Sequence, residues 1–392
     1  MQKSMLTTFK EKFDTDKEPL TFFAPGRINL IGEHTDYNGG YVFPASISFG
    51  TYALVSKRDD QIIRFYSMNF PETGVVTIDL DSLDYDTEHD WTNYPKGMMQ
   101  FMRSQGASIS HGVDVLYYGT IPNSAGLSSS ASIEMVTGVF LKALFANSFS
   151  QLDLVQIGQQ VENEYIGVNS GIMDQFAIGM GKQDHAIHLD TSTLDYTYAP
   201  IHLPAHQILI IHTNKARTLQ DSKYNERREQ CESALNDLQK KLDIKHLCDI
   251  TPDEFERYES LITSPVDKQR AKHAIYENQR TIEALEELKQ HNLQQFGKLM
   301  NASHQSLKED YEVTGVELDT IAETAQKQPG VLGARMTGAG FGGCAIAIVE
   351  KKYLEQVQQK IQDVYTENIG YEPTFYIANI GDQAKQITNE VM

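Results

Sequence analysis

The sequence is poor in cysteine and contains no long hydrophobic run, and each absence narrows the class of protein. Its 392 residues include only three cysteines, Cys231, Cys248 and Cys344, whose wide spacing matches neither a zinc site nor a disulfide framework. No apolar stretch reaches the roughly 18–20 residues that a membrane-spanning helix needs. The nearest candidate, residues 330–349, contains Arg335 and is interrupted by glycines. We therefore expect a protein of a reducing compartment without a membrane span.

Basic residues are also scarce relative to acidic ones. The chain has 34 lysines and arginines against 53 aspartates and glutamates, which gives a formal net charge of −19 that no basic block offsets. Such a charge argues against nucleic acid as a partner, although a local site with donors and a metal ion could still bind a nucleotide. Residues 1–19 carry mixed charges without the apolar core of a signal peptide, so we expect a cytoplasmic protein.

The length and composition predict two domains or one large two-lobed unit. Hydrophobic residues make up 40% of the chain, enough for a sizeable core, and the charged fraction of 22% is ordinary for a globular protein. Strand and helix patterns are mixed without a regular βαβ alternation, which favours an α+β fold over a doubly wound sheet. A segment near residues 190–205 marks the expected boundary, giving lobes of residues 1–200 and 201–392.

Hydrophobic periodicity and capping residues give the expected elements. A helix is expected from Ser150, an N-cap with Asp153 three residues later, to about Gly167. Segment 167–181 is glycine-rich and loop-like at its ends. The other predicted helices cover residues 130–146, 224–242, 268–289 and 293–307, and the predicted strands cover residues 22–24, 52–56, 61–66, 75–80, 113–118, 208–212, 344–349 and 374–378.

The most informative run is residues 24–38, with the sequence APGRINLIGEHTDYN. It combines a cation, two carboxylates and an imidazole with apolar residues at strand-like spacing. Burying such polar side chains is costly unless they meet partners or a ligand, so the run predicts the wall of a site for a small, hydroxyl-rich molecule. Glu33, His34 and Asp36 do not converge readily on one metal ion, and hydrogen bonds to hydroxyl groups suit them better.

A second motif, residues 122–132 with the sequence PNSAGLSSSAS, lies between a predicted strand and a predicted helix. Small residues let the backbone approach a ligand closely, and the free amides at a helix N-terminus bind anions. The motif lacks the G-x-x-x-x-G-K-[ST] pattern of P-loop enzymes, and Ser130 stands where a nucleophile elbow needs glycine. It indicates a phosphate-binding loop, with a serine-rich helix cap as the alternative.

A third motif, residues 337–343 with the sequence TGAGFGG, fits the G-x-G-x-x-G spacing of dinucleotide-binding loops. That fingerprint must open a helix, whereas residues 344–349 are a predicted strand. A dinucleotide-binding role is therefore excluded by context.

In this order, the motifs resemble those of galactokinases, members of the GHMP family of small-molecule kinases. The run 24–38 is similar to their N-terminal signature, residues 126–132 to their phosphate motif, residues 171–175 to the segment with their catalytic aspartate, and residues 337–343 to a third motif expected to shape the cleft. The resemblance implies a bilobal GHMP fold, with a ribosomal-S5-like N-terminal lobe, a ferredoxin-like C-terminal lobe and the active site between them. It also implies phosphorylation of galactose at its anomeric O1 by MgATP; the sequence leaves the oligomeric state open, with a monomer favoured.

The resemblance further implies residue roles. Asp174 would take the proton from the anomeric hydroxyl, and Arg27 would pair with Asp174 and face the transferred phosphoryl group. Ser130 and Glu162 would bind Mg²⁺. The residues implied to contact galactose are Glu33, His34, Thr35, Asp36 and Tyr224, and those implied to contact ATP are Ser67, Trp91, Tyr94, Asn123, Ser124, Ala125, Gly126, Leu127, Ser128, Ser129 and Ser130.

Taken one at a time, several of these residues have simpler explanations. Asp174 could be a solvated turn residue, Glu162 an exposed helix residue, and Tyr224 and Trp91 core aromatics. A carboxylate held as an anion by Arg27 is a weaker base, so Asp174 could remove the proton or mainly orient the hydroxyl. Two other functions stay open: a sugar-binding regulatory sensor, against which the complete serine loop argues, and a kinase for N-acetylgalactosamine, arabinose or another hexose.

Overall fold

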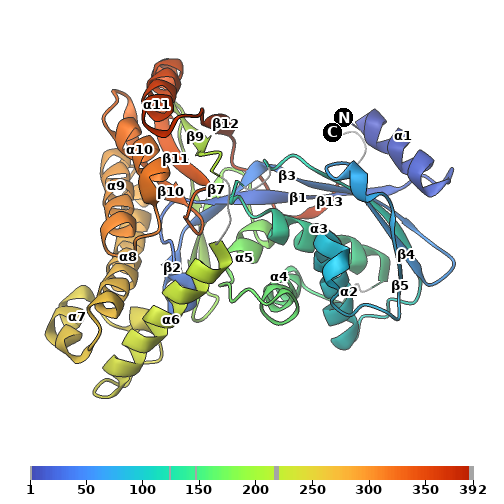
Figure 1. The fold of residues 1–392 in the computed structure, drawn as a ribbon, viewed down its shortest axis with the longest axis horizontal. Coiled ribbons are helices and arrows are strands. Elements are labelled where there is room, and N and C mark those ends of the chain that lie inside the picture. Colours follow the sequence, from blue (N-terminus) through green and yellow to red (C-terminus); the bar gives the residue numbers. More distant parts are fainter. Residues whose placement is uncertain (1, 123–124, 146–147, 216–219, 388–392) are drawn as a thin grey trace.

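The computed structural model describes residues 2–122, 125–145, 148–215 and 220–387, which form two bodies of sheet and helix side by side (Figure 1). The first body is built on a six-stranded sheet with the order β13-β1-β3-β6-β4-β5. Strands β4 and β6 pair in parallel, and the other neighbours pair antiparallel. Its strands are β1 (Leu20–Asn29), β3 (Pro44–Lys57), β4 (Ile62–Ser67), β5 (Val76–Asp79), β6 (Val113–Gly119) and β13 (Lys385–Ile387).

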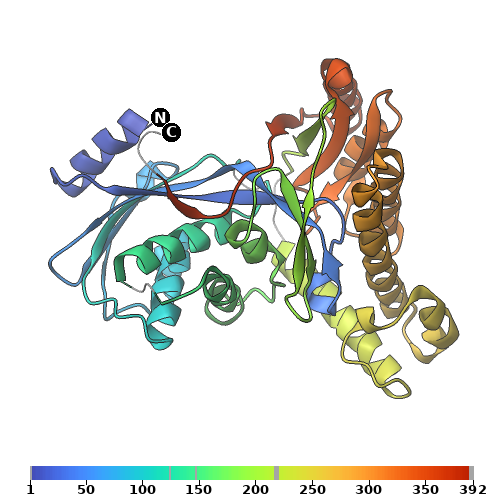
Figure 2. The same cartoon turned by 180° about the vertical axis from the view of Figure 1, so that it is seen from behind.

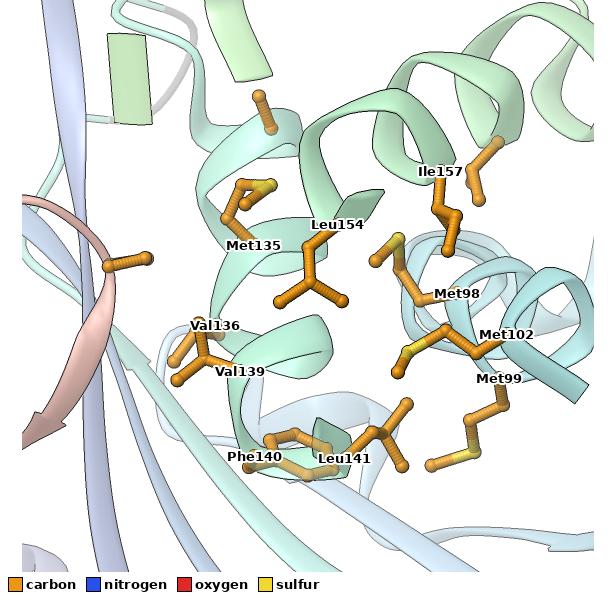
Figure 3. Close-up of a cluster of buried hydrophobic side chains, with 14 of the residues drawn as sticks. Met98, Met99, Met102, Met135, Val136, Val139, Phe140, Leu141, Leu154 and Ile157 are labelled. Atoms are coloured by element: carbon orange, nitrogen blue, oxygen red, sulfur yellow. The ribbon is translucent and has the colours of Figure 1, made fainter. Parts of the chain in front are cut away.

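Helices cover both faces of this sheet. Successive residues of a strand point to opposite faces, so Ala53 and Val55 of β3 join the large core beneath four helices, whereas Leu54 joins a smaller cluster with α1. Figure 3 shows the centre of the large core, where methionines of α2 meet aliphatic side chains of α3 and α4. These helices are α1 (Gln2–Phe13), α2 (Asn93–Ser104), α3 (Ser129–Phe145), α4 (Gln151–Gln160) and α5 (Met173–Gly179).

The second body is built on an antiparallel sheet with the order β10-β11-β9-β12. Both of its faces are buried, since Ile208 and Ile210 of β9 enter one core and Leu209 and Ile211 enter another. Burial on both faces explains why β9 and β11 read as continuous apolar runs. The elements are β9 (His206–His212), β10 (Val331–Thr337), β11 (Cys344–Glu350), β12 (Thr374–Ala378), α6 (Gln220–Gln239), α7 (Pro252–Tyr258), α8 (Pro265–Lys289), α9 (Leu293–Glu309), α10 (Gly315–Gln326) and α11 (Leu354–Ile369).

Two features connect the bodies. A small sheet of β2 (Tyr41–Val42), β7 (His185–Asp190) and β8 (Tyr196–Pro200) packs against α8. After β12 the chain crosses back to the first sheet, where the Ser48 amide donates to the Asn379 carbonyl at 3.0 Å and β13 pairs with β1 (Figure 2). The last described strand therefore belongs to the first sheet.

The predicted strands are present, mostly with longer bounds, and the predicted N-cap at Ser150 is confirmed. The Ser150 hydroxyl accepts from the Asp153 amide at 3.1 Å, and the Asp153 carboxylate accepts from the Ser150 amide at 2.6 Å. The expected helix to Gly167 changes type on the way, because α4 is followed by a π-helix, Val161–Ile166, which ends at Gly167 with φ 86°. Segment 167–181 contains α5 between its loop-like ends.

The other predicted helices are present as α3, α6, α8 and α9, and residue 146 of the predicted 130–146 lies outside the described residues. None of the helices in the described ranges combines the length and apolar character that crossing a bilayer requires. Short 3₁₀ helices complete the fold at Asp36–Asn38, Pro71–Thr73, Thr87–Thr92, Leu247–Asp249, Glu259–Leu261 and Lys351–Tyr353.

A testable consequence concerns the contact between α9 and β10. A Cβ atom added at Gly297 would lie 2.1 Å from the Leu332 carbonyl oxygen, so the two backbones touch. We expect Gly297→Ala to lower the free energy of unfolding by about 1–3 kcal/mol, because the helix must move off the strand. Urea unfolding measures this. Gly119→Ala is the control, since its Cβ would meet no atom closer than 3.6 Å, and an equal loss in both variants would contradict the argument.

Candidate active site

A cavity of about 470 Å³ opens between the two bodies, and we call it the central cavity. Arg27 of β1, Ser130 of α3, Glu162 of the π-helix and Asp174 of α5 all line it. The family resemblance of the sequence implies that these four residues share one site, although the chain separates the first from the last by 147 positions. The structure brings them together.

Arg27 and Asp174 form a two-pronged ion pair at the centre of this cavity. Arg27 Nε donates to Asp174 Oδ1 at 2.7 Å and Arg27 Nη2 to Oδ2 at 2.8 Å. The guanidinium side chain is 5% exposed and the carboxylate side chain 27%, so Asp174 is the partner that a bound molecule can reach. A bidentate pair of this kind fixes both distance and orientation.

The phosphate loop wraps around the same ion pair. Arg27 Nη1 donates to the Gly126 carbonyl at 2.7 Å, and the Ser128 hydroxyl donates to Asp174 Oδ2. Gly26 permits this approach, because a Cβ there would lie 2.7 Å from the Leu127 carbonyl oxygen. Ala125 and Leu127 are buried and anchor the loop in the core, while Asn123 and Ser124 lie outside the described residues.

Ser130 and Glu162 meet beside the loop. The Ser130 hydroxyl donates to Glu162 Oε1 at 2.8 Å, and the Ser170 hydroxyl donates to Oε2 at 2.7 Å. Burial, followed by the negative charge of Asp174, raises the pKa of Glu162. No lysine, arginine or histidine forms a salt bridge with it in the described part of the chain, so a buried carboxylate lacks a cation.

This donor set fits a magnesium ion, which prefers hard oxygen ligands and keeps several waters or substrate oxygens. The described residues contain no group of three His, Cys, Asp or Glu side chains placed around one point. A metal ion at Ser130 and Glu162 would therefore take its remaining ligands from water and phosphate.

The segment 33–36 forms another wall of the cavity. Glu33 Oε1 accepts from the Gly338 amide at 2.7 Å and from Arg335 Nη1 at 3.3 Å, which ties it to the third glycine motif. Gly338 and its neighbour Ala339 line the cavity, as expected for a motif that shapes the cleft. Asp36 packs against Gly171, where a Cβ would lie 1.8 Å from Asp36 Oδ2, so only glycine fits there.

His34 and Tyr224 also line the cavity, whereas Thr35 does not. The Thr35 hydroxyl hydrogen-bonds with the carbonyl oxygens of Gly32 at 2.9 Å and Tyr41 at 2.7 Å, so it braces the loop from behind. Burial, and next the nearby His273, lowers the pKa of His34 to about 3, which keeps its ring neutral at neutral pH.

A second, smaller cavity of about 210 Å³ adjoins the central one, and Tyr94 and Ser130 line both. It also contains Ser67, Trp91 and Ser129, so three separated segments predicted to contact a nucleotide do meet. The Trp91 ring packs at 5.6 Å, edge to face, on Tyr117, and its Nε1 has no hydrogen-bond partner among the described residues.

Sequence reasoning missed the buried residues that hold these groups. Glu277 of α8 is fully buried and accepts from the Gly32 amide at 2.9 Å and the Ser303 hydroxyl at 2.5 Å. Arg335 is equally buried and donates to the Asn29 carbonyl at 3.0 Å. A charged residue inside an apolar strand pattern was the available signal for Arg335, whereas Glu277 looks like any acidic residue of a long helix.

The acid-rich wall predicts a pH dependence of stability. Burial, and then the charge of Asp174, raises the pKa of Asp36 to about 6. In the unfolded chain Asp36 ionises near pH 3.9, so the folded state binds the extra proton between about pH 4 and pH 6 and loses relative stability as pH rises through that window. We expect Asp36→Asn to become more stable than the wild type across this window, with a constant difference above it. Urea midpoints at intervals of one pH unit measure the difference.

The control for this prediction is Glu254→Gln, far from the cavity. Hydrogen bonds from the Thr251 amide and hydroxyl lower the pKa of Glu254. The ionised carboxylate therefore stabilises the wild type relative to Glu254→Gln above the pKa of the unfolded chain, and this stabilisation is lost as the pH falls. If both variants changed in the same direction, the electrostatic account of Asp36 would be wrong.

Comparison with known proteins bears on this arrangement. Residues 7–57 match the galactokinase galactose-binding signature, residues 93–182 the N-terminal domain of GHMP kinases, and residues 284–367 their C-terminal domain. A galactokinase of Lactiplantibacillus plantarum is 57% identical over 97% of this chain and 98% of its own. One of Staphylococcus saprophyticus is 55% identical over 99% of this chain and all of its own.

Solved structures support the same relationship to the galactokinases. The crystal structure of Lactococcus lactis galactokinase complexed with galactose superposes with a TM-score of 0.97 at 51% identity, over 98% of this chain and 99% of the other. A mevalonate kinase shares the fold alone, with a TM-score of 0.65 at 18% identity over 93% of this chain. The mixed α+β architecture is thus the bilobal GHMP kinase fold, as the sequence predicted, and the chain belongs to the galactokinase family of GHMP kinases.

Proposed function

We propose that this protein transfers the terminal phosphoryl group of ATP to the anomeric O1 of galactose, giving galactose 1-phosphate and ADP. Membership of the galactokinase family supports both substrates. The observation that carries the proposal is the Arg27–Asp174 ion pair, which lies where the phosphate loop and the 33–36 segment meet in one cavity.

The sugar would lie against Glu33, His34, Asp36 and Tyr224. Glu33 Oε1 is occupied by Gly338 and Arg335, so its Oε2 is the oxygen that can accept from a sugar hydroxyl. His34 Nδ1 is paired with the Tyr37 hydroxyl at 2.9 Å, so Nε2 is the ring nitrogen without a partner among the described residues. We assign Thr35 a positioning role, because its hydroxyl is used by the loop itself.

ATP would extend from the second cavity to the phosphate loop. Ser67, Trp91 and Tyr94 offer an aromatic and polar pocket for the base, in which the Trp91 ring supplies a flat apolar surface. The phosphates would lie on the loop from Asn123 to Ser130, including Ala125, Gly126, Leu127, Ser128 and Ser129, whose amides precede and open α3. The helix N-terminus stabilises negative charge at that point.

In the reaction, the O1–phosphorus bond forms while the bond between phosphorus and the oxygen of the ADP leaving group breaks, and the O1 proton passes to the Asp174 carboxylate. Arg27 and Ser128 donate hydrogen bonds to this carboxylate, which fixes the direction in which its oxygens face a bound sugar. Asp174 therefore orients the hydroxyl in the ground state and accepts the proton late, as O1 loses electron density to phosphorus. Arg27 offsets the charge of the transferring group.

Ser130 and Glu162 would hold Mg²⁺, which when bound neutralises negative charge on the phosphates. The uncompensated buried carboxylate of Glu162 supports this assignment. We further propose a cytoplasmic monomer without nucleic acid or membrane partners, with lobes of residues 1–200 and 201–392, except that β13 joins the sheet of the first lobe. Three free cysteines and a net charge of −19 support the compartment and the absence of nucleic acid.

A substrate panel tests the proposal directly. Purified protein is incubated with MgATP and galactose, N-acetylgalactosamine, arabinose or glucose, and each product is identified by its mass and by the position of the phosphate. We expect phosphate on O1 of galactose as the main product. Failure to form any sugar phosphate would reject the proposed activity, and a preference for another sugar would reject the proposed substrate.

A second test removes the proton acceptor. We expect Asp174→Asn to lower kcat by about 100-fold to 10,000-fold, because the amide can hold the hydroxyl but cannot take its proton. Coupled ADP release measures kcat, and circular dichroism confirms that the fold is retained. Asp184→Asn is the matched control, since that aspartate lies on a turn with φ 59°, which asparagine also adopts, outside the central cavity. Equal activity of the two variants would contradict the assigned role.

A further inference from the structure

Directly behind the catalytic groups lies a buried pair of one acid and one amide, Glu134 of α3 and Gln175 of α5. Both residues are 0% exposed. Gln175 Nε2 donates to Glu134 Oε2 at 3.0 Å. The remaining oxygens, Glu134 Oε1 and Gln175 Oε1, are buried and have no hydrogen-bond partner among the described residues. Orphaned oxygens of this kind are costly inside a protein.

The surroundings of Glu134 contain negative rather than positive charge. No lysine, arginine or histidine of the described chain forms a salt bridge with it, and the nearby charges that act on it are those of Glu162 and Asp174. A carboxylate at this position would be desolvated, unpaired and repelled. Burial accordingly raises the pKa of Glu134 well above its usual range, with the charge of Glu162 as the next cause.

One proton resolves both difficulties. A protonated carboxyl donates through one oxygen and accepts through the other, and a primary amide does the same through its nitrogen and oxygen. With a proton on Oε1, Glu134 can donate to Gln175 Oε1 while it accepts from Gln175 Nε2. The two orphaned oxygens then become each other's partners, and no charge is buried.

The pair joins the two helices that carry the proposed chemistry. Glu134 lies one helical turn after Ser130, and residues four apart occupy the same face of an α-helix. Gln175 directly follows Asp174 in α5, a helix of only seven residues. Gly158 of α4 gives the pair its space, because a Cβ there would lie 2.9 Å from Gln175 Cγ and 3.4 Å from Glu134 Oε2.

We propose that Glu134 works as a neutral carboxylic acid, and that the Glu134–Gln175 pair is a positioning unit that fixes Asp174 relative to Ser130 and Glu162. The proposal rests on the roles given above to those three residues. Neither member of the pair lines the central cavity or the smaller cavity beside it. Its effect is to hold the start of a short helix against α3, so that the acceptor of the O1 proton keeps its place beside the phosphate loop.

The first experiment detects the proton itself. Infrared difference spectra of wild type against Glu134→Gln, in the absence of substrates at about pH 8, where exposed carboxyls are ionised, isolate the carbonyl band of a protonated acid. We expect the wild type to show that band and the variant to lack it. If the variant instead lacked the band of an ionised carboxylate that the wild type shows, the proposal would be overturned, whether or not the protein phosphorylates galactose.

The second experiment measures positioning. Glu134→Gln keeps a two-bond partner for Gln175, so we expect kcat within about twofold of the wild type, whereas Glu134→Leu loses both bonds and should lower kcat about tenfold or more with the galactose KM little changed. Gln175→Glu adds an acid to an acidic cluster and should also lower kcat. Exchanging the two in Glu134→Gln/Gln175→Glu rebuilds an acid–amide pair and should recover most of the loss.

Asp114→Asn is the matched control, a buried acid of the first sheet held by Arg58 and Arg64. It should lower thermal stability without changing kcat. The proposal is overturned if Glu134→Leu keeps the wild-type kcat, if Glu134→Gln is as damaging as Glu134→Leu, or if the exchange recovers nothing. Where Glu134→Leu fails to fold, the exchange variant and the infrared band decide. A wild type that forms no galactose 1-phosphate but shows the band would reject the proposed function alone.

Discussion

The ion pair between Arg27 and Asp174 is the interaction on which the rest of the active site depends. It joins β1, α5 and the phosphate loop at one point, because the guanidinium also donates to the Gly126 carbonyl. Loss of Asp174 would leave the buried Arg27 guanidinium without its ion-pair partner, which is far more costly than never having buried the pair. The close approach of β1 to the loop at Gly26 is therefore a requirement of the chemistry as well as of the packing.

A second constraint is the excess of carboxylates around the cavity. Backbone amides and arginines compensate some of them, as Gly338 and Arg335 do for Glu33. Other carboxylates can be neutralised only by a bound cation. Glu162, for example, has hydroxyl partners and no cationic partner in the described chain. In the proposed complex, an acidic protein receives a polyanionic nucleotide because the anion would approach the loop amides, while the acids would face the sugar and a metal ion. Net charge alone does not predict this arrangement.

Much of the site could be predicted from the sequence, because its compact motifs resemble those of a known family and the resemblance implies which of their residues meet. Arg27, Ser130 and Asp174 were expected together and do line one cavity. The supporting layer could not be predicted, because Glu277 and Glu134 meet their partners only through tertiary packing and look like ordinary helix residues in one dimension. The fold shows the same division: strands with continuous apolar runs were found, whereas α1 and α2, whose charges or breaks hide the pattern, were not.

The return of the chain to its first sheet has a consequence for solubility. Strand β1 would otherwise present an open row of amide and carbonyl groups beside its long partner β3, and exposed edges of this kind recruit strands from other molecules. β13 covers part of that edge, from Thr21 to Phe23. The segment that tethers the second body to the first thus also removes part of an edge at which the folded molecule could pair with another copy.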